Sequence, residues 1–144
     1  MNVQERIAKA RTELEATEPI TVKVEVGGEV TELSFRPLTG MGWADLTAAY
    51  PPRAGATLDQ NIGYNLDAVV AAFPPQNVLI DGGPALVDGV NVCTEIVGVL
   101  ASPHLKRIGE VLFHIQQMVP AQRLVELGKA SAGVQKRKPR SPAK

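Results

Sequence analysis

The chain of 144 residues is poor in cysteine, histidine and aromatic residues. It has one cysteine and two histidines, and aromatic side chains make up 4% of it. A single cysteine excludes an intrachain disulfide, which suits a reducing compartment. Because each large ring can remove roughly 150–250 Å² from water, the segment in which the few rings gather is expected to organise the packing.

Long apolar runs are also absent. The longest runs are far shorter than the roughly 20 residues that a membrane-spanning helix needs, and the first residues lack the apolar centre of a signal peptide. The composition, 44% hydrophobic and 21% charged, is typical of an ordinary globular domain, and a chain of this length can bury its own core. We therefore expect a soluble protein of the cytosol without a membrane segment.

The net charge is zero, but the charges are unevenly distributed. Residues 1–128 carry 9 basic and 15 acidic side chains, whereas residues 129–144 carry 6 basic and no acidic ones. Large apolar side chains are nearly absent after residue 128, which predicts one globular domain over residues 1–128 and a disordered basic tail over residues 129–144.

The basic tail is a candidate binding segment. Basic side chains can contact nucleic acid through its phosphates, but the acidic body would oppose duplex binding, so we expect a solubilising end or a docking arm instead. An acidic protein surface would be an equally suitable partner. The candidate residues are Lys136, Arg137, Lys138 and Arg140.

The first half of the chain reads as a helix followed by a β-hairpin. Apolar residues at spacings of four, three and four predict an amphipathic helix over residues 3–15 that docks through a narrow stripe. The period then changes to two, which predicts strands over residues 20–26 and 29–35 joined by a two-residue glycine turn. That turn would pair Val26 with Glu29 and Ile20 with Phe35. The helical stripe is Val3, Ile7, Ala10 and Leu14.

Short helices are expected next. Thr39 or Gly40 can cap a helix that ends at the proline pair 51–52, and a polar loop over residues 53–60 follows. A second helix would begin at Asn61 and end at the proline pair 74–75. The segment 76–83 is compatible with either a small third strand or a packed loop.

The second half of the chain reads as an antiparallel pair of helices. Periodic apolar residues predict one helix over residues 84–100, and a Ser-Pro start predicts another over residues 102–119. Pro120 would begin one or two further turns that end at Gly128. The overall expectation is an α+β fold, mainly α-helical, as a single domain whose N-terminal β-hairpin (about residues 20–36) is covered by helices.

No catalytic, cofactor-binding or metal-binding motif is recognisable. The phosphate loop, the dinucleotide fingerprint, the nucleophile elbow and the paired-histidine zinc motif are all missing from the sequence. Cys93 lies on the apolar stripe of its predicted helix, where a cysteine packs as a small hydrophobe, and His104 and His114 would face different sides of theirs. The acidic residues Asp81 and Asp88 precede glycines and are interpreted as turn residues. We expect no enzyme, cofactor or metal.

The aromatic-rich segment between residues 35 and 73 carries a resemblance to a known family. Its motifs are Arg36-Pro37-Leu38-Thr39-Gly40, then Trp43 and Leu46, then Tyr50-Pro51-Pro52-Arg53, then Gly63-Tyr64-Asn65. Together with the size, the acidic body and the late basic segment, these motifs resemble the tail assembly chaperones of long-tailed (siphovirus-type) bacteriophages that infect actinobacteria. The resemblance covers roughly residues 20–73, and the second half lacks the tryptophan-containing helix expected of such proteins.

The resemblance implies a non-enzymatic chaperone that binds the phage tape measure protein, and itself, in the host cytoplasm during tail assembly. A structural virion protein, such as a minor tail or head-to-tail joining component, is the alternative. A holdase needs exposed apolar surface. The two candidate surfaces are the Trp43/Leu46/Tyr50 side of the helix before the proline pair 51–52 and the stripe of residues 3–14. Trp43 could instead cover the hairpin, which makes residues 50–53 the better exposed candidate. The candidate partner-binding residues are Trp43, Leu46, Tyr50, Pro51, Pro52, Arg53, Ile7 and Leu14.

Overall fold

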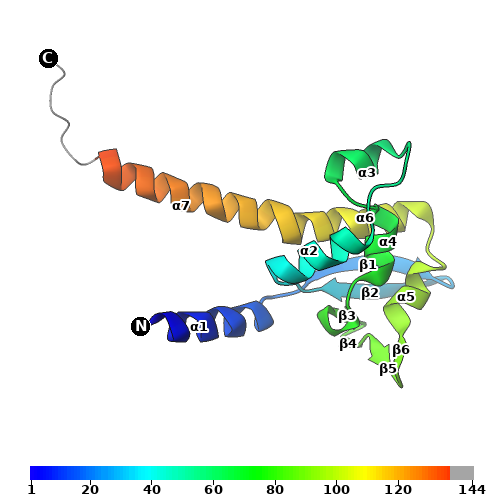
Figure 1. Ribbon diagram of the computed structural model, residues 1–144. Helices are drawn as coiled ribbons and strands as arrows, with labels where there is room; N and C mark the ends of the chain where they lie inside the picture. Colours follow the sequence, from blue (N-terminus) through cyan, green and yellow to red (C-terminus); the bar gives the residue numbers. More distant parts are fainter. Residues whose placement is uncertain (137–144) are drawn as a thin grey trace, which may run out of the picture.

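The protein has a mixed α+β fold that is mainly helical (Figure 1). The computed structural model describes the backbone of residues 1–136 and the side chains of residues 1–129. The helices are α1 (Val3–Glu15), α2 (Gly40–Ala49), α3 (Thr57–Ile62), α4 (Leu66–Ala72), α5 (Val92–Val97), α6 (Ser102–Phe113) and α7 (Val119–Lys136), with a 3-10 turn, η1 (Pro75–Asn77), and a π turn, η2 (His114–Met118). The strands are β1 (Ile20–Val26), β2 (Glu29–Phe35), β3 (Val78–Ile80), β4 (Gly83–Pro84), β5 (Leu86–Val87) and β6 (Val90–Asn91).

The predicted hairpin is confirmed together with its register. Strands β1 and β2 pair antiparallel from Ile20 opposite Phe35 to Val26 opposite Glu29. Gly27 and Gly28 both adopt positive φ, 61° and 83°, which two-residue hairpin turns demand and which a residue without Cβ adopts readily. The turn and the alternation of apolar residues therefore fix the same register.

Strand β3 resolves the open question about residues 76–83 in favour of a strand. It pairs antiparallel with β2 and β4 pairs with β3, which gives a four-stranded sheet in the order β1-β2-β3-β4. At its end the Asp81 carboxylate accepts a hydrogen bond from the Glu32 amide over 2.9 Å, and the Asp81 amide donates to the Glu32 carbonyl over 2.8 Å. Asp81 is thus a turn residue that anchors β3 to β2.

Helices α4 and α6 contribute most of the helical side of the core. Helix α6 packs against β1, and α4 packs against α6. Phe35 of β2 meets Phe73 edge to face, with ring centroids 5.8 Å apart. The least exposed core residues from these elements are Val22, Val24, Leu33, Phe35, Val69, Val70, Phe73, Ile108 and Leu112.

The helix predicted over residues 84–100 is wrong in its first half. Residues 83–91 instead form β4 and a small hairpin of β5 and β6, and only the six residues of α5 are helical. The reason is the Asp88-Gly89 pair, which adopts positive φ angles of 50° and 77° and thereby makes a hairpin turn that no helix can contain. An antiparallel pair of equally long helices is therefore not formed.

The helix predicted from Asn61 to residue 73 is divided into two. Helix α3 begins earlier, at Thr57, inside the expected loop, and Gly63 ends it with a positive φ of 89°. Helix α4 starts afresh with Asn65 as its cap, whose side chain accepts a hydrogen bond from the Ala68 amide. A continuous apolar spacing does not reveal this break, because the stripe continues across the turn.

Helices α6 and α7 form one long rod through the π turn η2, in which helical backbone continues without a loop. Pro120, which has no amide hydrogen to donate, directly follows the π turn, where the hydrogen-bond pattern of the rod changes. Gly128 does not end the helix, which continues to Lys136 and thus includes the first part of the segment 129–144 that was expected to be a disordered tail. Arg137, Lys138 and Arg140 lie outside the described residues.

Candidate partner-binding surfaces

Helix α1 has almost no contact with the rest of the protein. None of its side chains is buried, and in Figure 1 it projects from the body on the same side as α7. Val3 is 57% exposed and Ile7 is 40% exposed, while Leu14 in the last turn is half-buried. Because an isolated helix of about 12–15 residues is marginal in water, the apolar stripe of α1 needs a cover that the described part of the chain does not supply.

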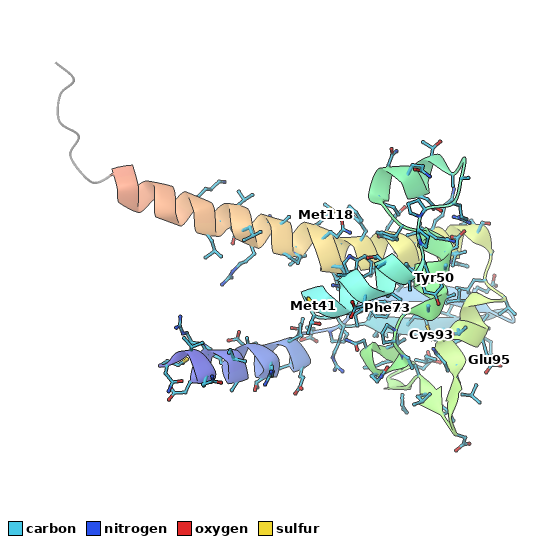
Figure 2. The ribbon with its side chains drawn as sticks, in the orientation of Figure 1. Met41, Tyr50, Phe73, Cys93, Glu95 and Met118 are labelled. Atoms are coloured by element: carbon cyan, nitrogen blue, oxygen red, sulfur yellow. The ribbon has the colours of Figure 1, made fainter. Side chains whose placement is uncertain are left out.

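Helix α7 presents a second apolar surface. Beyond the π turn it extends away from the body, and the side chains along it stand clear of other elements (Figure 2). Leu124 is 69% exposed, Val125 is 56% exposed and Leu127 is 54% exposed. The sequence predicts a short final helix here, but the exposure of its apolar side chains depends on where the neighbouring elements lie.

The candidate residues in α2 and just after it differ from one another in how far they are exposed. Trp43 is buried, and its ring meets Tyr64 edge to face with centroids 5.3 Å apart. Leu46 is half-buried against the core, whereas Tyr50 at the end of α2 is 36% exposed. Of the proline pair, Pro51 is exposed and Pro52 is half-buried. Trp43 is therefore a packing residue, and the candidate residues of this segment that reach the surface are Tyr50, Pro51 and Arg53.

Arg53 joins the loop after α2 to α3 and α4. Its guanidinium donates to both carboxylate oxygens of Asp59, over 2.7 and 3.0 Å, and to Asp67 over 3.0 Å. Its backbone amide donates to Asp59 as well, over 3.1 Å. A bidentate arginine and carboxylate pair fixes geometry strongly, so the predicted contact residue is part of an internal clasp, even though about half of its side chain is exposed.

Asp59 is the charged member of the clasp that lies inside the protein. It is 1% exposed, and the hydrogen bonds from the Arg53 side chain hold the pKa of its carboxyl well below the usual range despite burial. The Arg53 pKa is raised by the same pair of carboxylates. In the sequence, Asp59 and Asp67 follow Arg53 by 6 and 14 positions. Only the folded structure shows that the three side chains meet.

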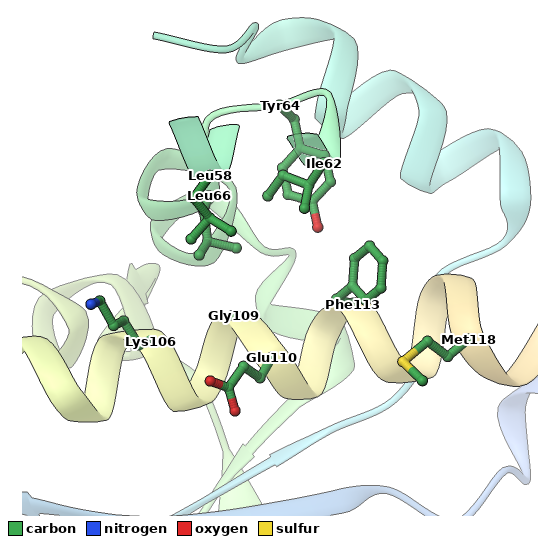
Figure 3. A pocket seen from close by; sticks show the side chains of 9 residues that line it. All are labelled: Leu58, Ile62, Tyr64, Leu66, Lys106, Gly109, Glu110, Phe113 and Met118. Carbon is green, nitrogen blue, oxygen red and sulfur yellow. The ribbon is translucent and has the colours of Figure 1, made fainter. Parts of the chain in front are cut away.

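An apolar pocket of about 330 Å³ opens between the α3–α4 turn and the rod formed by α6 and α7 (Figure 3). In Figure 3 the Tyr64 ring points from the turn toward α6, close to Phe113. Tyr64 is 2% exposed and its hydroxyl has no hydrogen-bond partner among the described residues; burial raises its pKa to about 12. The lining residues are Leu58, Ile62, Tyr64, Leu66, Lys106, Gly109, Glu110, Phe113 and Met118.

A second hollow, of about 460 Å³, lies where the end of α1 meets the segment after β2. Leu14 lines it together with the Arg36-Pro37 segment and Asn77. The Asn77 amide donates to the Pro37 carbonyl over 3.0 Å, and Gln116 holds the Leu38 backbone from the other side. Hydrogen bonds to η1 and η2 thus fix the backbone at Pro37 and Leu38. Among the candidate partner-binding residues, Leu14 is the one that lines this hollow.

The cysteine is buried, and the described side chains form no cluster of the kind that holds a metal. Cys93 is 2% exposed in α5, and burial raises the pKa of its thiol to about 11, so the reactive thiolate is disfavoured at neutral pH. Among the side chains of residues 1–129, no three histidine, cysteine or acidic groups come together as a metal site would require. Within residues 1–136, none of the helices combines the length and the apolar character that crossing a bilayer requires.

Comparison with protein-family models, with curated proteins and with solved structures finds no match for this chain.

Proposed function

We propose that the protein is a non-enzymatic tail assembly chaperone of a long-tailed bacteriophage, which binds the tape measure protein in the host cytoplasm before the tail tube forms. The observation that carries this proposal is the pair of helices α1 and α7, which project from the body with uncovered apolar side chains. An uncovered apolar helix face is the surface with which an amphipathic partner helix is held.

The positions of the other candidate residues also support α1 and α7 as the binding surfaces. Trp43 is buried and Arg53 belongs to the clasp. These residues of the aromatic-rich segment therefore stabilise the fold and are not free to bind a partner. We assign the client-binding role to Ile7 on α1 and Leu124 on α7, both of which are exposed. Self-association through the same faces is part of the proposal, because two copies would cover each other in the absence of client.

The proposal is tested by co-expressing the tagged protein with the tape measure protein and measuring how much is recovered. Ile7→Asp and Leu124→Asp place a charge on an apolar face and are expected to reduce recovery at least about tenfold, since a desolvated unpaired charge costs more than 1.4 kcal/mol. Val30→Asp is the matched control, because Val30 is 70% exposed but lies on the hairpin. Equal recovery with all three variants would contradict the assignment to α1 and α7.

A structural virion protein is the second candidate, because exposed helices also suit a subunit that polymerises. Mass spectrometry of purified particles distinguishes the two: a chaperone is expected to be absent, whereas a tail or joining component would be stoichiometric.

A further inference from the structure

Strand β1 is an outer strand of the four-stranded sheet, with β2 as its neighbour. The backbone amide and carbonyl of Glu32 in β2 both bond to Asp81 at the end of β3. Even-numbered residues of β2 therefore direct these groups toward β3, and odd-numbered residues direct theirs toward β1. Since the register pairs those odd-numbered residues with even-numbered residues of β1, the amides and carbonyls of Thr21, Lys23 and Glu25 point away from the sheet.

These outward groups form a free edge, which we define as the backbone of Thr21, Lys23 and Glu25. Among the described residues, no hydrogen bond is made to the amide or the carbonyl of any of the three. All three residues are exposed. A row of unpaired donors and acceptors at the two-residue repeat of a strand is the template on which another extended chain pairs.

The side chains along the free edge indicate which extended chain would pair with it. Lys23 and Glu25 are exposed on one face of the sheet, whereas Val22 and Val24 are buried on the other. An antiparallel strand places one side chain directly opposite each of these residues, where opposite charges attract and like charges repel. An acidic residue opposite Lys23, a basic residue opposite Glu25 and apolar residues opposite the valines are therefore favoured.

Helix α6 distinguishes a second copy of the protein from another polypeptide as the occupant. The segment from Val22 to Val26 is itself complementary to this pattern when it runs antiparallel, but α6 packs against β1 in every copy. Neighbouring strands are about 4.8 Å apart, whereas packed helices need about 8–10 Å between their axes. Two copies paired through β1 would bring their α6 helices too close. An extended segment without a helix above it avoids this conflict.

We propose that the free edge of β1 binds an extended segment of a partner polypeptide as an additional antiparallel strand of the sheet. From its N-terminus the segment has an apolar, a basic, an apolar, an acidic and an apolar residue. Its basic residue lies opposite Glu25 and its acidic residue opposite Lys23, and the backbones at these two positions exchange hydrogen bonds. The site lies on β1, apart from α1 and α7, and is independent of the proposed function.

The probe is the synthetic peptide acetyl-Thr-Val-Lys-Val-Glu-Val-Thr-amide, N-methylated at its valines so that its outer edge cannot pair with a second peptide. Titration of the full-length protein is expected to give saturable NMR shifts at the amides of Thr21, Lys23 and Glu25. The matched peptide is N-methylated at its lysine and glutamate instead. It should bind at least about tenfold more weakly, because it loses two hydrogen bonds of about 1 kcal/mol each. Equal binding of the two peptides, or no saturable shift, would overturn the proposal.

A proline variant locates binding at the free edge. Lys23→Pro removes an outward amide but no hydrogen bond to β2, which is the placement that an edge strand tolerates. We expect it to keep the fold and to bind the peptide at least about fivefold more weakly than Lys23→Thr, which loses the same charge but keeps the amide. Equal binding by the two variants would contradict strand pairing at this edge.

Exchanging the charges tests the pattern and does not depend on the proline variant. A peptide with its lysine and glutamate exchanged is expected to bind the wild type about fivefold more weakly, because two attractive cross-strand pairs become repulsive. The double variant Lys23→Glu/Glu25→Lys should prefer the exchanged peptide by a similar factor. If both proteins show the same preference, or none, the assigned pattern is wrong.

Two further outcomes separate this site from other surfaces. Self-association that persists in Ile7→Asp but is lost in Lys23→Pro, measured by sedimentation, would assign the free edge to a second copy and overturn the proposal. If the wild type recovers no tape measure protein but binds the peptide as expected, the proposed function fails while the strand-binding site stands.

Discussion

Among the described side chains, Asp59 is the charged residue that is buried in the core. Its hydrogen-bonded ion pair with Arg53 makes this burial possible. Its carboxylate accepts hydrogen bonds from the Arg53 guanidinium, from the Arg53 amide and, over 3.4 Å, from the Leu66 amide. A buried anion is tolerated only when its lone pairs are used in this way. The clasp thereby fixes the α3–α4 turn, which carries one wall of the apolar pocket that faces α6.

The first prediction concerns Asp59→Asn, which keeps the shape of the side chain but removes its charge. Because the pKa of Asp59 is depressed by Arg53, the stability it confers is present above the unfolded-state value of roughly 3.9 and is lost as the pH falls further. We expect the variant to be less stable by about 2 kcal/mol at neutral pH, with a smaller difference near pH 3.

Urea denaturation at about pH 7, 5 and 3 measures this difference, since the midpoint reports stability when the slope is unchanged. Asp45→Asn on the exposed side of α2 serves as the matched control, and it should leave the midpoint within experimental error at each pH. An Asp59→Asn deficit that grows on acidification would contradict the assigned direction of the pKa shift.

Two helical glycines give a second prediction at the residue scale. A Cβ added to Gly109 would lie 2.7 Å from Leu66 Cδ1 and 2.9 Å from its Cγ, whereas one added to Gly128 meets nothing within 4 Å. We expect Gly109→Ala to destabilise the protein by about 1–3 kcal/mol through overpacking. Gly128→Ala should stabilise it by up to about 1 kcal/mol through helix propensity.

The measurement is the free energy of unfolding of both variants under one set of conditions. The difference between the two glycines is the informative quantity, because the chemical change is the same. Equal effects would mean that α4 and α6 do not approach as closely as the structure places them.

At the scale of elements, some helices and strands pack against the core and others do not. The hairpin of β1 and β2 is held by β3 on one side and by α6 above its apolar face. Helix α1, in contrast, ends where Leu14 touches the segment after β2 and is otherwise uncovered. Tertiary packing supplies most helical stability in proteins, so these elements should differ widely in local stability.

Hydrogen exchange gives the corresponding prediction. The amides of α1 should exchange nearly as fast as in an unfolded peptide, while those of β2 exchange only through global unfolding. Adding the client should slow exchange in α1 and α7 and leave β2 unchanged. Strong protection of α1 in the free protein at low concentration would show that the helix already has a partner surface within the chain.

At the scale of the whole molecule, the body and the two projecting helices differ in how much of their apolar surface is covered. The body contains the sheet, α4, α6 and the clasp, and Trp43 and Tyr64 of the aromatic-rich segment lie in its core. Helices α1 and α7 project from the same side of the body and both carry uncovered apolar residues. This division is why an acidic substitution on α1 or α7 is expected to change binding without changing the fold.

The sequence alone determined those elements that depend only on residues close together in the chain. The glycine turn and the alternation over residues 20–35 fixed the hairpin and its register, the spacing over residues 3–15 fixed α1, and Thr39 capped α2 as expected. Each depends on neighbours within a few residues, so no distant contact was needed to infer it. The same reasoning failed at residues 84–91, where the spacing of apolar residues outweighed a local turn signal.

Tertiary structure decided the rest, because burial and convergence depend on residues far apart in the chain. Arg53 could be an exposed contact or an internal clasp until Asp59 and Asp67 were placed beside it. The Tyr64 pocket joins segments more than 40 residues apart, and the exposure of α7 depends on which elements do not reach it. Sequence thus determined the local elements, whereas the arrangement of those elements decided which apolar residues form the core and which remain available to a partner.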